Sequence, residues 1–211
     1  VDNLNVYYGN FQAVNNVSFF VKQGEIFGLL GPNGAGKTST LSAVEGLIKQ
    51  QSGTVTVAGY DTLKNPLHAR AAMGVQLQAT SFQPELTVAE ILELYASIYG
   101  LKLTQPLLHA LLKEINLAEA ENKKFGQLSG GQQQRVPVAR AVVNKPKLIL
   151  ADEPTGNLDS SNGNEVMELL TDLNEQGTTI IMVTHSEHDA RYSHRIIRML
   201  DGQTVTESIL A

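Results

Sequence analysis

The chain has 211 residues, a formal net charge of −5 and no cysteine. This length suits one core of ordinary size, or a core with a small appended lobe. The acidic balance, without any basic stripe, argues against a nucleic-acid partner. The lack of cysteine excludes disulfides, thiolate chemistry and cysteine-ligated zinc. No apolar run approaches the roughly 18 residues that cross a bilayer, so we expect no direct membrane insertion.

The N-terminal segment predicts two short strands, at residues 4–8 and 17–21. They are separated by the turn-prone pairs Gly9-Asn10 and Asn15-Asn16. Tyr8 directly precedes a glycine in a polar turn, where its ring could stack on a purine base. It is equally typical of a half-buried strand tyrosine, and the sequence leaves both interpretations open.

A glycine-rich loop lies between a predicted strand at residues 26–30 and a predicted helix that continues through residues 39–44. The loop residues, including the serine that follows, are Gly31, Pro32, Asn33, Gly34, Ala35, Gly36, Lys37, Thr38 and Ser39. Strand, glycine loop and helix in this order are typical of a phosphate-binding loop. Backbone N–H groups at the start of a helix form an anion site, and the peptide dipoles add positive potential.

The last residues of this loop predict the chemistry of the ligand. Lys37 supplies a positive charge for the β- and γ-phosphates of a nucleotide, and the Thr38 hydroxyl is placed to coordinate Mg²⁺. We therefore expect a nucleoside triphosphate with Mg²⁺ at this loop.

Two further strands are predicted downstream of the loop helix. Residues 54–58 alternate as a half-exposed strand, and residues 73–77 form another, with Gln78 at its C-terminal end. Ligands collect at that edge of open α/β sheets. Gln78 is therefore a candidate for orienting Mg²⁺ or the attacking water, although a solvated loop amide explains it as well.

Residues 84–144 predict a helical lobe inserted into an α/β chain. Thr87 and Glu90 have the spacing of a capping box before an amphipathic helix that ends at Gly100. A second apolar stripe, from Leu107 to Ile115, predicts another helix. These stripes are typical of a lobe core rather than of a ligand site.

The lobe ends with a second glycine-rich helix start, Leu128-Ser129-Gly130-Gly131-Gln132. Ser129 and Gln132 again have capping-box spacing, and the two glycines bare the first N–H groups of the helix. One chain with one nucleotide pocket does not need two anion sites. The second site therefore suggests the nucleotide of another subunit, although a plain helix cap has the same spacing.

Acidic and histidine residues follow two buried strands. The run at residues 147–151 leads into Asp152 and Glu153, and the strand at residues 179–183 leads into Thr184-His185. Asp152 is predicted to reach Mg²⁺, and Glu153 to polarise the water that attacks the γ-phosphorus. His185 could hydrogen-bond the γ-phosphate. Residues 195–206 are predicted to close the chain as a hairpin.

The histidines outside that pair have no metal-ligand spacing, and we expect them at the surface: His68, His109, His188 and His194.

Taken together, these motifs resemble the nucleotide-binding domain of ABC transporters over essentially the whole chain. The segment Leu128 to Gln132 is similar to the signature sequence of that family, and Asn157-Leu158-Asp159 is similar to its D-loop. The resemblance implies an α/β fold with a RecA-like P-loop NTPase core. It also implies an N-terminal antiparallel β subdomain and an inserted α-helical subdomain. We predict a single domain, with the core and β subdomain at residues 1–83 and 145–211 and the helical subdomain at residues 84–144.

The resemblance also implies a role for each candidate site residue. Tyr8 matches the aromatic residue that stacks on adenine, Gln78 the Q-loop glutamine, and Glu153 the catalytic glutamate. His185 matches the switch histidine. It further implies a head-to-tail dimer that holds two ATP molecules, each between the phosphate loop of one subunit and Ser129, Gly130 and Gly131 of the other. Asp159, in the D-loop match, is also expected to bind the nucleotide.

Two features depart from a plain member of that family. Pro137 lies well inside the signature helix, where a small residue is usual, and predicts a kink or weakened ordering of the lobe. Residues up to about Gly126 resemble drug and polysaccharide exporter ATPases, whereas residues from Leu148 onward resemble lipoprotein-release and macrolide-export ATPases. This mosaic suggests a natural or designed chimera.

The leading functional prediction is an ATPase subunit that drives export through a separate membrane-spanning permease. Such a subunit would be cytoplasmic, held at the inner face of the cell membrane by the permease. The alternatives are a non-transport ABC ATPase and an engineered ATPase domain without a native permease.

Overall fold

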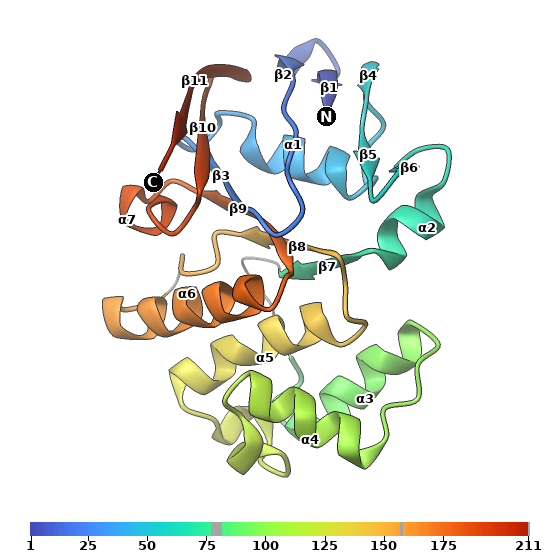
Figure 1. Cartoon of the computed structure of the whole chain (residues 1–211), viewed down its shortest axis with the longest axis vertical. Coiled ribbons are helices and arrows are strands. Elements are labelled where there is room, and N and C mark those ends of the chain that lie inside the picture. The colour runs from blue at the N-terminus through green and yellow to red at the C-terminus, as the bar shows by residue number, and fades with distance from the viewer. Residues whose placement is uncertain (77–81, 157, 211) are drawn as a thin grey trace.

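The computed structural model describes residues 1–76, 82–156 and 158–210. Its centre is a six-stranded sheet in which neighbouring strands are parallel, except for the hairpin at one edge. The strands in spatial order are β11 (Gln203–Ile209), β10 (Arg195–Leu200), β3 (Ile26–Leu30), β9 (Thr179–Thr184), β8 (Leu148–Asp152) and β7 (Met73–Gln76). Figure 1 shows this sheet between helices on its two faces.

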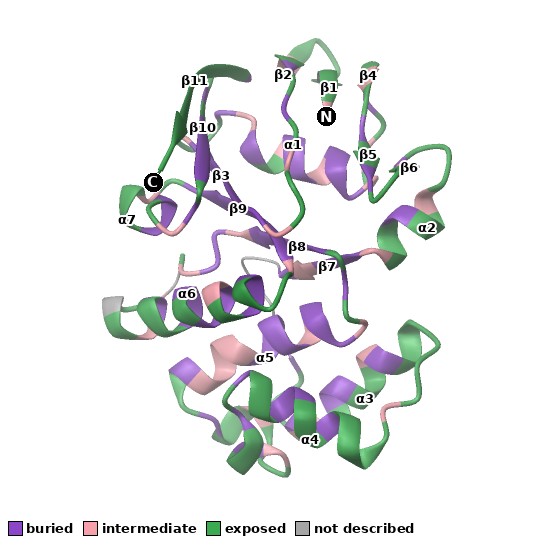
Figure 2. Cartoon of the chain, in the orientation of Figure 1, coloured by how far each residue is buried: buried purple, intermediate pink, exposed green. Residues whose placement is uncertain are grey.

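The central strands are buried on both faces, as their continuous apolar sequences predict (Figure 2). Alternate residues of one strand belong to different cores because successive side chains point to opposite faces. On β9, Ile180 and Met182 pack in the core shared with the helical lobe. Ile181 and Val183 pack in the core shared with α1 and the N-terminal strands.

A smaller antiparallel sheet covers the first helix. It consists of β2 (Phe11–Val17), β1 (Asp2–Tyr8) and β4 (Ser52–Thr54), in that order, with the short hairpin of β5 (Thr56–Val57) and β6 (Tyr60–Asp61) beside it. The prediction of an N-terminal antiparallel subdomain agrees with this arrangement. The single strand predicted at residues 54–58 is instead divided between β4 and β5.

The prediction of a strand at residues 17–21 is wrong, because the second strand runs from Phe11 to Val17. The turn expected at Asn15-Asn16 lies inside that strand. Asn16 has a φ of 53°, and its backbone N–H donates to the side chain of Asn5 at 3.0 Å. A local irregularity in the pairing of β1 with β2 therefore accommodates the asparagine pair without ending the strand.

The helices fall into two groups. Those that accompany the sheets are α1 (Lys37–Val44), α2 (Pro66–Ala71), α6 (Ser160–Glu175) and α7 (Glu187–Ala190). Those at the far end of the molecule in Figure 1 are α3 (Val88–Ile98), α4 (Gln105–Glu114) and α5 (Gly130–Val142), with the short 3₁₀ helices η1 (Ala118–Ala120) and η2 (Phe125–Gln127). The second group corresponds to the predicted helical lobe.

The signature helix α5 joins the lobe to the sheet. Its C-terminal half packs on β7 so closely that a Cβ atom at Gly74 would collide with the carbonyl of Ala141. Helix α5 begins at the predicted capping box and continues through the buried Pro137 to Val142, so the proline does not end the helix. None of the helices within the described ranges is long and apolar enough to cross a membrane.

Candidate active site

The loop between β3 and α1 has backbone angles that require glycine. Gly34 and Gly36 have φ values of 83° and 92°, and Gly36 is the N-cap of α1. A Cβ atom at Gly31 would collide with the carbonyl of Met199 at the end of β10. The loop therefore packs against the carboxyl end of β10, and the N-terminus of α1 faces a cavity that an anion can enter.

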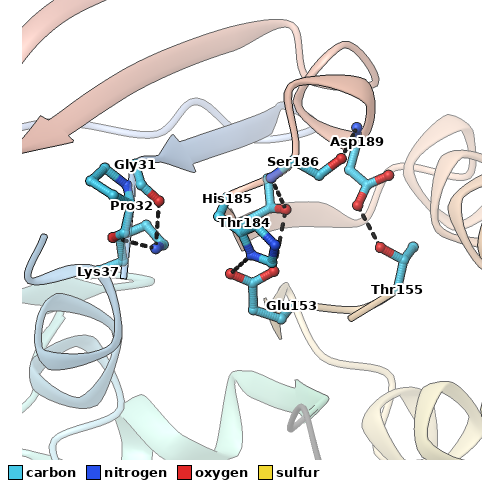
Figure 3. Close-up of polar contacts among 9 residues, drawn as sticks. All are labelled: Gly31, Pro32, Lys37, Glu153, Thr155, Thr184, His185, Ser186 and Asp189. Carbon is cyan, nitrogen blue, oxygen red and sulfur yellow. Dashed lines mark hydrogen bonds and ion pairs between the residues drawn. The ribbon is translucent and has the colours of Figure 1, made fainter. Parts of the chain in front are cut away.

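Lys37 is the buried cation of this loop, with 5% of its surface exposed. Its Nζ donates hydrogen bonds to the carbonyls of Gly31 at 2.7 Å and Pro32 at 3.0 Å (Figure 3). Within the described residues, no carboxylate forms an ion pair with it. Its charge is thus available to an anion that enters the loop.

Two of the three predicted metal ligands, Thr38 and Asp152, lie close enough for the Thr38 side chain to affect the Asp152 carboxyl group. Burial and the charge of Glu153 raise the pKa of Asp152, and these effects outweigh Lys37 and Thr38, which lower it. Hydroxyl and carboxylate oxygens side by side fit Mg²⁺, which prefers oxygen ligands and completes its shell with phosphates and water. The described residues contain no cluster of three or more acidic or histidine side chains that would hold a metal without such help.

Glu153 directly follows β8 in a left-handed backbone conformation, with a φ of 48°. This conformation is uncommon for residues other than glycine, costs free energy, and is often found at functional sites. Oε1 of Glu153 lies 2.9 Å from Nδ1 of His185, and the Thr184 hydroxyl donates to Oε2 at 3.4 Å (Figure 3). The structure thus adds Thr184, for which no role was predicted, as a neighbour of Glu153.

A cavity of about 290 Å³ brings Tyr8 and part of the phosphate loop together with Glu153 and His185. Its lining residues are Tyr8, Phe11, Ala13, Asn33, Gly34, Gly36, Lys37, Thr38, Ser39, Glu153 and His185. Tyr8 and Phe11 remain 52% and 65% exposed. Phe11 was missed by the sequence analysis, although an aromatic residue just after the Gly9-Asn10 turn is a usable signal.

The second glycine-rich helix start has the predicted capping box and lies away from the phosphate loop of its own chain. The Ser129 hydroxyl accepts from the Gln132 N–H at 3.3 Å, and Gln132 Oε1 accepts from the Ser129 N–H at 3.1 Å. Among the described residues that line the cavity around Lys37, Ser129, Gly130 and Gly131 do not appear. One chain therefore presents a phosphate loop and, separate from it, a second capped helix start.

The remaining predicted residues divide between the described and the undescribed parts of the chain. Asp159 is the N-cap of α6 and accepts from the Asn162 N–H at 2.9 Å. Gln78 lies outside the described residues. His68, His109, His188 and His194 are exposed, as expected.

The site lies at the carboxyl ends of three adjacent parallel strands, β3, β9 and β8, which supply the phosphate loop, His185 and the acid pair. A phosphate loop with a cation, oxygen ligands for Mg²⁺ and a carboxylate beside it defines the class of P-loop nucleoside triphosphatases. The inserted helical lobe and its capped glycine helix distinguish one branch of that class.

Comparison with known proteins identifies the branch. The family model described as "ABC transporter" matches residues 14–156. The linearmycin resistance ATP-binding protein LnrL of Bacillus subtilis is 35% identical over 95% of this chain and 65% of its own length. The Nod factor export ATP-binding protein I of Burkholderia orbicola is 37% identical over 95% of this chain and 67% of its own length. The chain therefore belongs to the ABC transporter family, as an ATPase domain of that family.

A solved structure agrees with this assignment. The dimeric structure of MJ0796, a bacterial ABC transporter cassette, has a TM-score of 0.85 and 36% identity, and the match covers 100% of this chain and 97% of that one. The post-hydrolysis dimer of MJ0796, bound to ADP and Pi, has a TM-score of 0.83 and 34% identity over the same shares. The predicted fold class is thus confirmed.

The chain spans about two thirds of the length of the curated relatives it matches. Each alignment covers 95% of the chain and does not compare its two parts separately. The hypothesis that the chain is a chimera therefore stays a prediction.

Proposed function

We propose that this chain is the ATP-hydrolysing subunit of an exporter, and that two copies, or one copy and a related subunit, enclose two Mg-ATP molecules head to tail. Lys37 and the loop amides would bind the phosphates, while Thr38 and Asp152 would hold Mg²⁺. Gln78 would complete the metal shell or orient the water. Mg²⁺ would neutralise charge on the phosphates.

The observation that carries this proposal is the incompleteness of the cavity around Lys37. It contains the phosphate loop, Glu153 and His185, but its described lining lacks Ser129–Gly131. Two copies arranged head to tail would place the glycine helix start of one chain over the nucleotide of the other. Asp159 would contribute to the same junction. The dimeric structure of MJ0796 supports an assembly of two subunits.

In the active site, Glu153 would accept a proton from the attacking water, and His185 would hold Glu153 and the γ-phosphate in register. Tyr8, beside Phe11, would stack on the adenine. The subunit would act at the cytoplasmic face of the membrane through a separate permease. The relatives named for Nod factor export and linearmycin resistance support export as the direction of transport.

The test is dimerisation of the Glu153→Gln variant in saturating Mg-ATP, measured by light scattering. Glutamine is isosteric but accepts no proton, so we expect a stable dimer and a hydrolysis rate lowered about 10²- to 10⁴-fold. Glu175→Gln makes the same charge change at an exposed position at the end of α6 and should hydrolyse ATP at the parent rate. A Glu153→Gln variant that remains monomeric would contradict two-subunit catalysis.

A further inference from the structure

The segment from Glu153 to Asp159 connects β8 to α6 and carries two proposed functional groups, and the structure describes its residues 153–156 and 158–159. Glu153 anchors its start through Thr184 and His185, and Asp159 anchors its end as the cap of α6. The main chain adds two turns, from the Gly156 N–H to the carbonyl of Glu153 and from the Leu158 N–H to that of Thr155, both at 3.0 Å.

Between the two ends, Thr155 fastens the segment to a different element. Its hydroxyl donates a hydrogen bond to Oδ2 of Asp189 on α7 (Figure 3). Asp189 is only 6% exposed. On its other side, Thr155 faces Gly163 of α6, where an added Cβ would lie 3.5 Å from the Thr155 Cβ. Thr155 thus lies between α6 and α7.

Asp189 is in turn fixed to the strand end that carries His185. Its backbone N–H donates to the Ser186 hydroxyl at 3.2 Å, and the Ser186 N–H donates to the Thr184 hydroxyl at 3.0 Å. The Thr184 hydroxyl contacts Glu153. The hydrogen bonds therefore close a ring that begins and ends on the segment, at Glu153 and at Thr155 (Figure 3).

We propose that Asp189 is a positioning residue for ATP hydrolysis: through Thr155 it fixes the segment between Glu153 and Asp159 relative to His185. The inference rests on the proposed role of Glu153. A buried carboxylate accepting from a hydroxyl is a strong hydrogen bond, and it supports a backbone whose φ at Glu153 is unfavourable. Misplacing a reacting group by about 1 Å can cost about 10²-fold in rate.

The experiment compares Thr155→Val with Thr155→Ser. Valine keeps the shape but removes the donor, whereas serine keeps the donor and removes the methyl group. We expect Thr155→Val to lower the kcat for ATP at least tenfold with the KM for ATP within threefold of the parent, and Thr155→Ser to retain at least half of the parent kcat. A Thr155→Val/Asp189→Ala double variant should lose no more than the worse single variant, since both cut the same bond.

Thr171→Val is the matched control, because the Thr171 hydroxyl on α6 donates only to the carbonyl of Met167 in its own helix among the bonds described. Its kcat should equal that of the parent, and every rate is measured well below the melting temperature of the variant. A parent-like kcat in Thr155→Val, an equal loss in Thr155→Ser, or a loss confined to KM would each overturn the inference. Glu153→Gln is assayed in parallel. If it still hydrolyses ATP, the proposed catalytic role fails. If it is inactive while Thr155→Val is active, only the positioning role fails.

Discussion

The carboxylate of Glu153 and the imidazole of His185 are hydrogen-bonded across the ends of two neighbouring parallel strands, with 2.9 Å between Oε1 and Nδ1. The register of the sheet accounts for this contact, because Asp152 pairs with Val183, so that Glu153 directly after β8 and His185 directly after β9 follow adjacent strand ends. Both side chains line the cavity that contains Lys37. A γ-phosphate entering that cavity would meet the pair directly.

The first prediction concerns His185. Replacing it with alanine removes one of the two described contacts of the Glu153 carboxylate and a donor for the γ-phosphate. We expect the kcat for ATP to fall about 10²-fold, because both proton acceptance and charge stabilisation lose a partner. The affinity for Mg-ATP should change less than threefold, since the phosphate loop and Tyr8 supply most of the binding. Steady-state hydrolysis and nucleotide titration measure the two effects separately.

His68→Ala is the control for His185→Ala, because His68 is exposed on α2, stacks on Tyr60 and does not line the described cavity around Lys37. It should hydrolyse ATP at the parent rate. Parent-like hydrolysis by His185→Ala would show that the contact with Glu153 has no role in turnover.

Much of the fold could be predicted from sequence because its signals are local. The capping boxes at Thr87 and Ser129 both form as predicted. The apolar runs before Asp152 and His185 become buried parallel strands. The N-terminal strands were the exception. The pairing of β2 with β1 overrides the turn preference of Asn15-Asn16, and this depends on Asn5, which is 11 residues from Asn16 in sequence.

The parts of the site that could not be predicted depend on three-dimensional contacts. Glu153 has a left-handed φ at the end of its strand. The hydrogen bond between Thr155 and Asp189 joins residues that are far apart in sequence. No spacing in the sequence encodes either of them. The same holds for the effect of the Thr38 side chain on the Asp152 carboxyl group, where the sequence predicted a shared metal but not a direct influence of one residue on the other.

The second prediction concerns pH and Glu45. This residue is 7% exposed at the end of α1, and burial, together with the charge of Asp152, raises its pKa to about 7 from an ordinary 4.5, against the opposing effect of Arg70. Between these two values the folded protein holds a proton that the unfolded chain has released. The contribution of Glu45 to the free energy of unfolding therefore falls as pH rises from 4.5 to about 7 and is lowest above that.

The Glu45→Gln variant tests this contribution, since glutamine stays neutral. Relative to the parent, its free energy of unfolding should gain about 3 kcal/mol between pH 4.5 and pH 8. Urea unfolding at a series of pH values measures the difference. Glu175→Gln removes an exposed carboxylate from α6 and should give a nearly constant difference. A pH-independent difference for Glu45→Gln would mean that the buried carboxylate titrates normally.

The third prediction concerns Pro137. It is buried inside α5 and lacks the N–H that would bond the carbonyl of Gln133 one turn earlier. Pro137→Ala should therefore stabilise the protein, by up to about 3 kcal/mol, less what is lost when the ring leaves its packing. We also expect a changed ATPase rate, because the same helix begins at Ser129. Thermal melting and steady-state hydrolysis test both effects, and an unchanged melting temperature with an unchanged rate would contradict them.

The fourth prediction separates stability from assembly at Gly130. A Cβ atom added there has no neighbour within 4 Å in the chain, and Gly130 is the first residue of α5. Gly130→Ala should thus leave the melting temperature unchanged or slightly raised, because alanine favours the helix by about 1 kcal/mol over glycine. In the proposed dimer, the same methyl group points at the nucleotide of the other subunit. We expect at least tenfold slower ATP hydrolysis and no ATP-dependent dimer when the change is made in the Glu153→Gln background.

Nucleotide binding to the single chain provides the internal control for Gly130→Ala, because the described cavity around Lys37 does not include Gly130. Binding of Mg-ATP to the monomer should match the parent, whereas dimerisation is lost. This combination would locate the defect at the junction between subunits rather than in the phosphate loop. If Gly130→Ala forms the nucleotide-dependent dimer as readily as the parent, the open start of α5 does not face the partner's nucleotide, and the head-to-tail arrangement would be wrong.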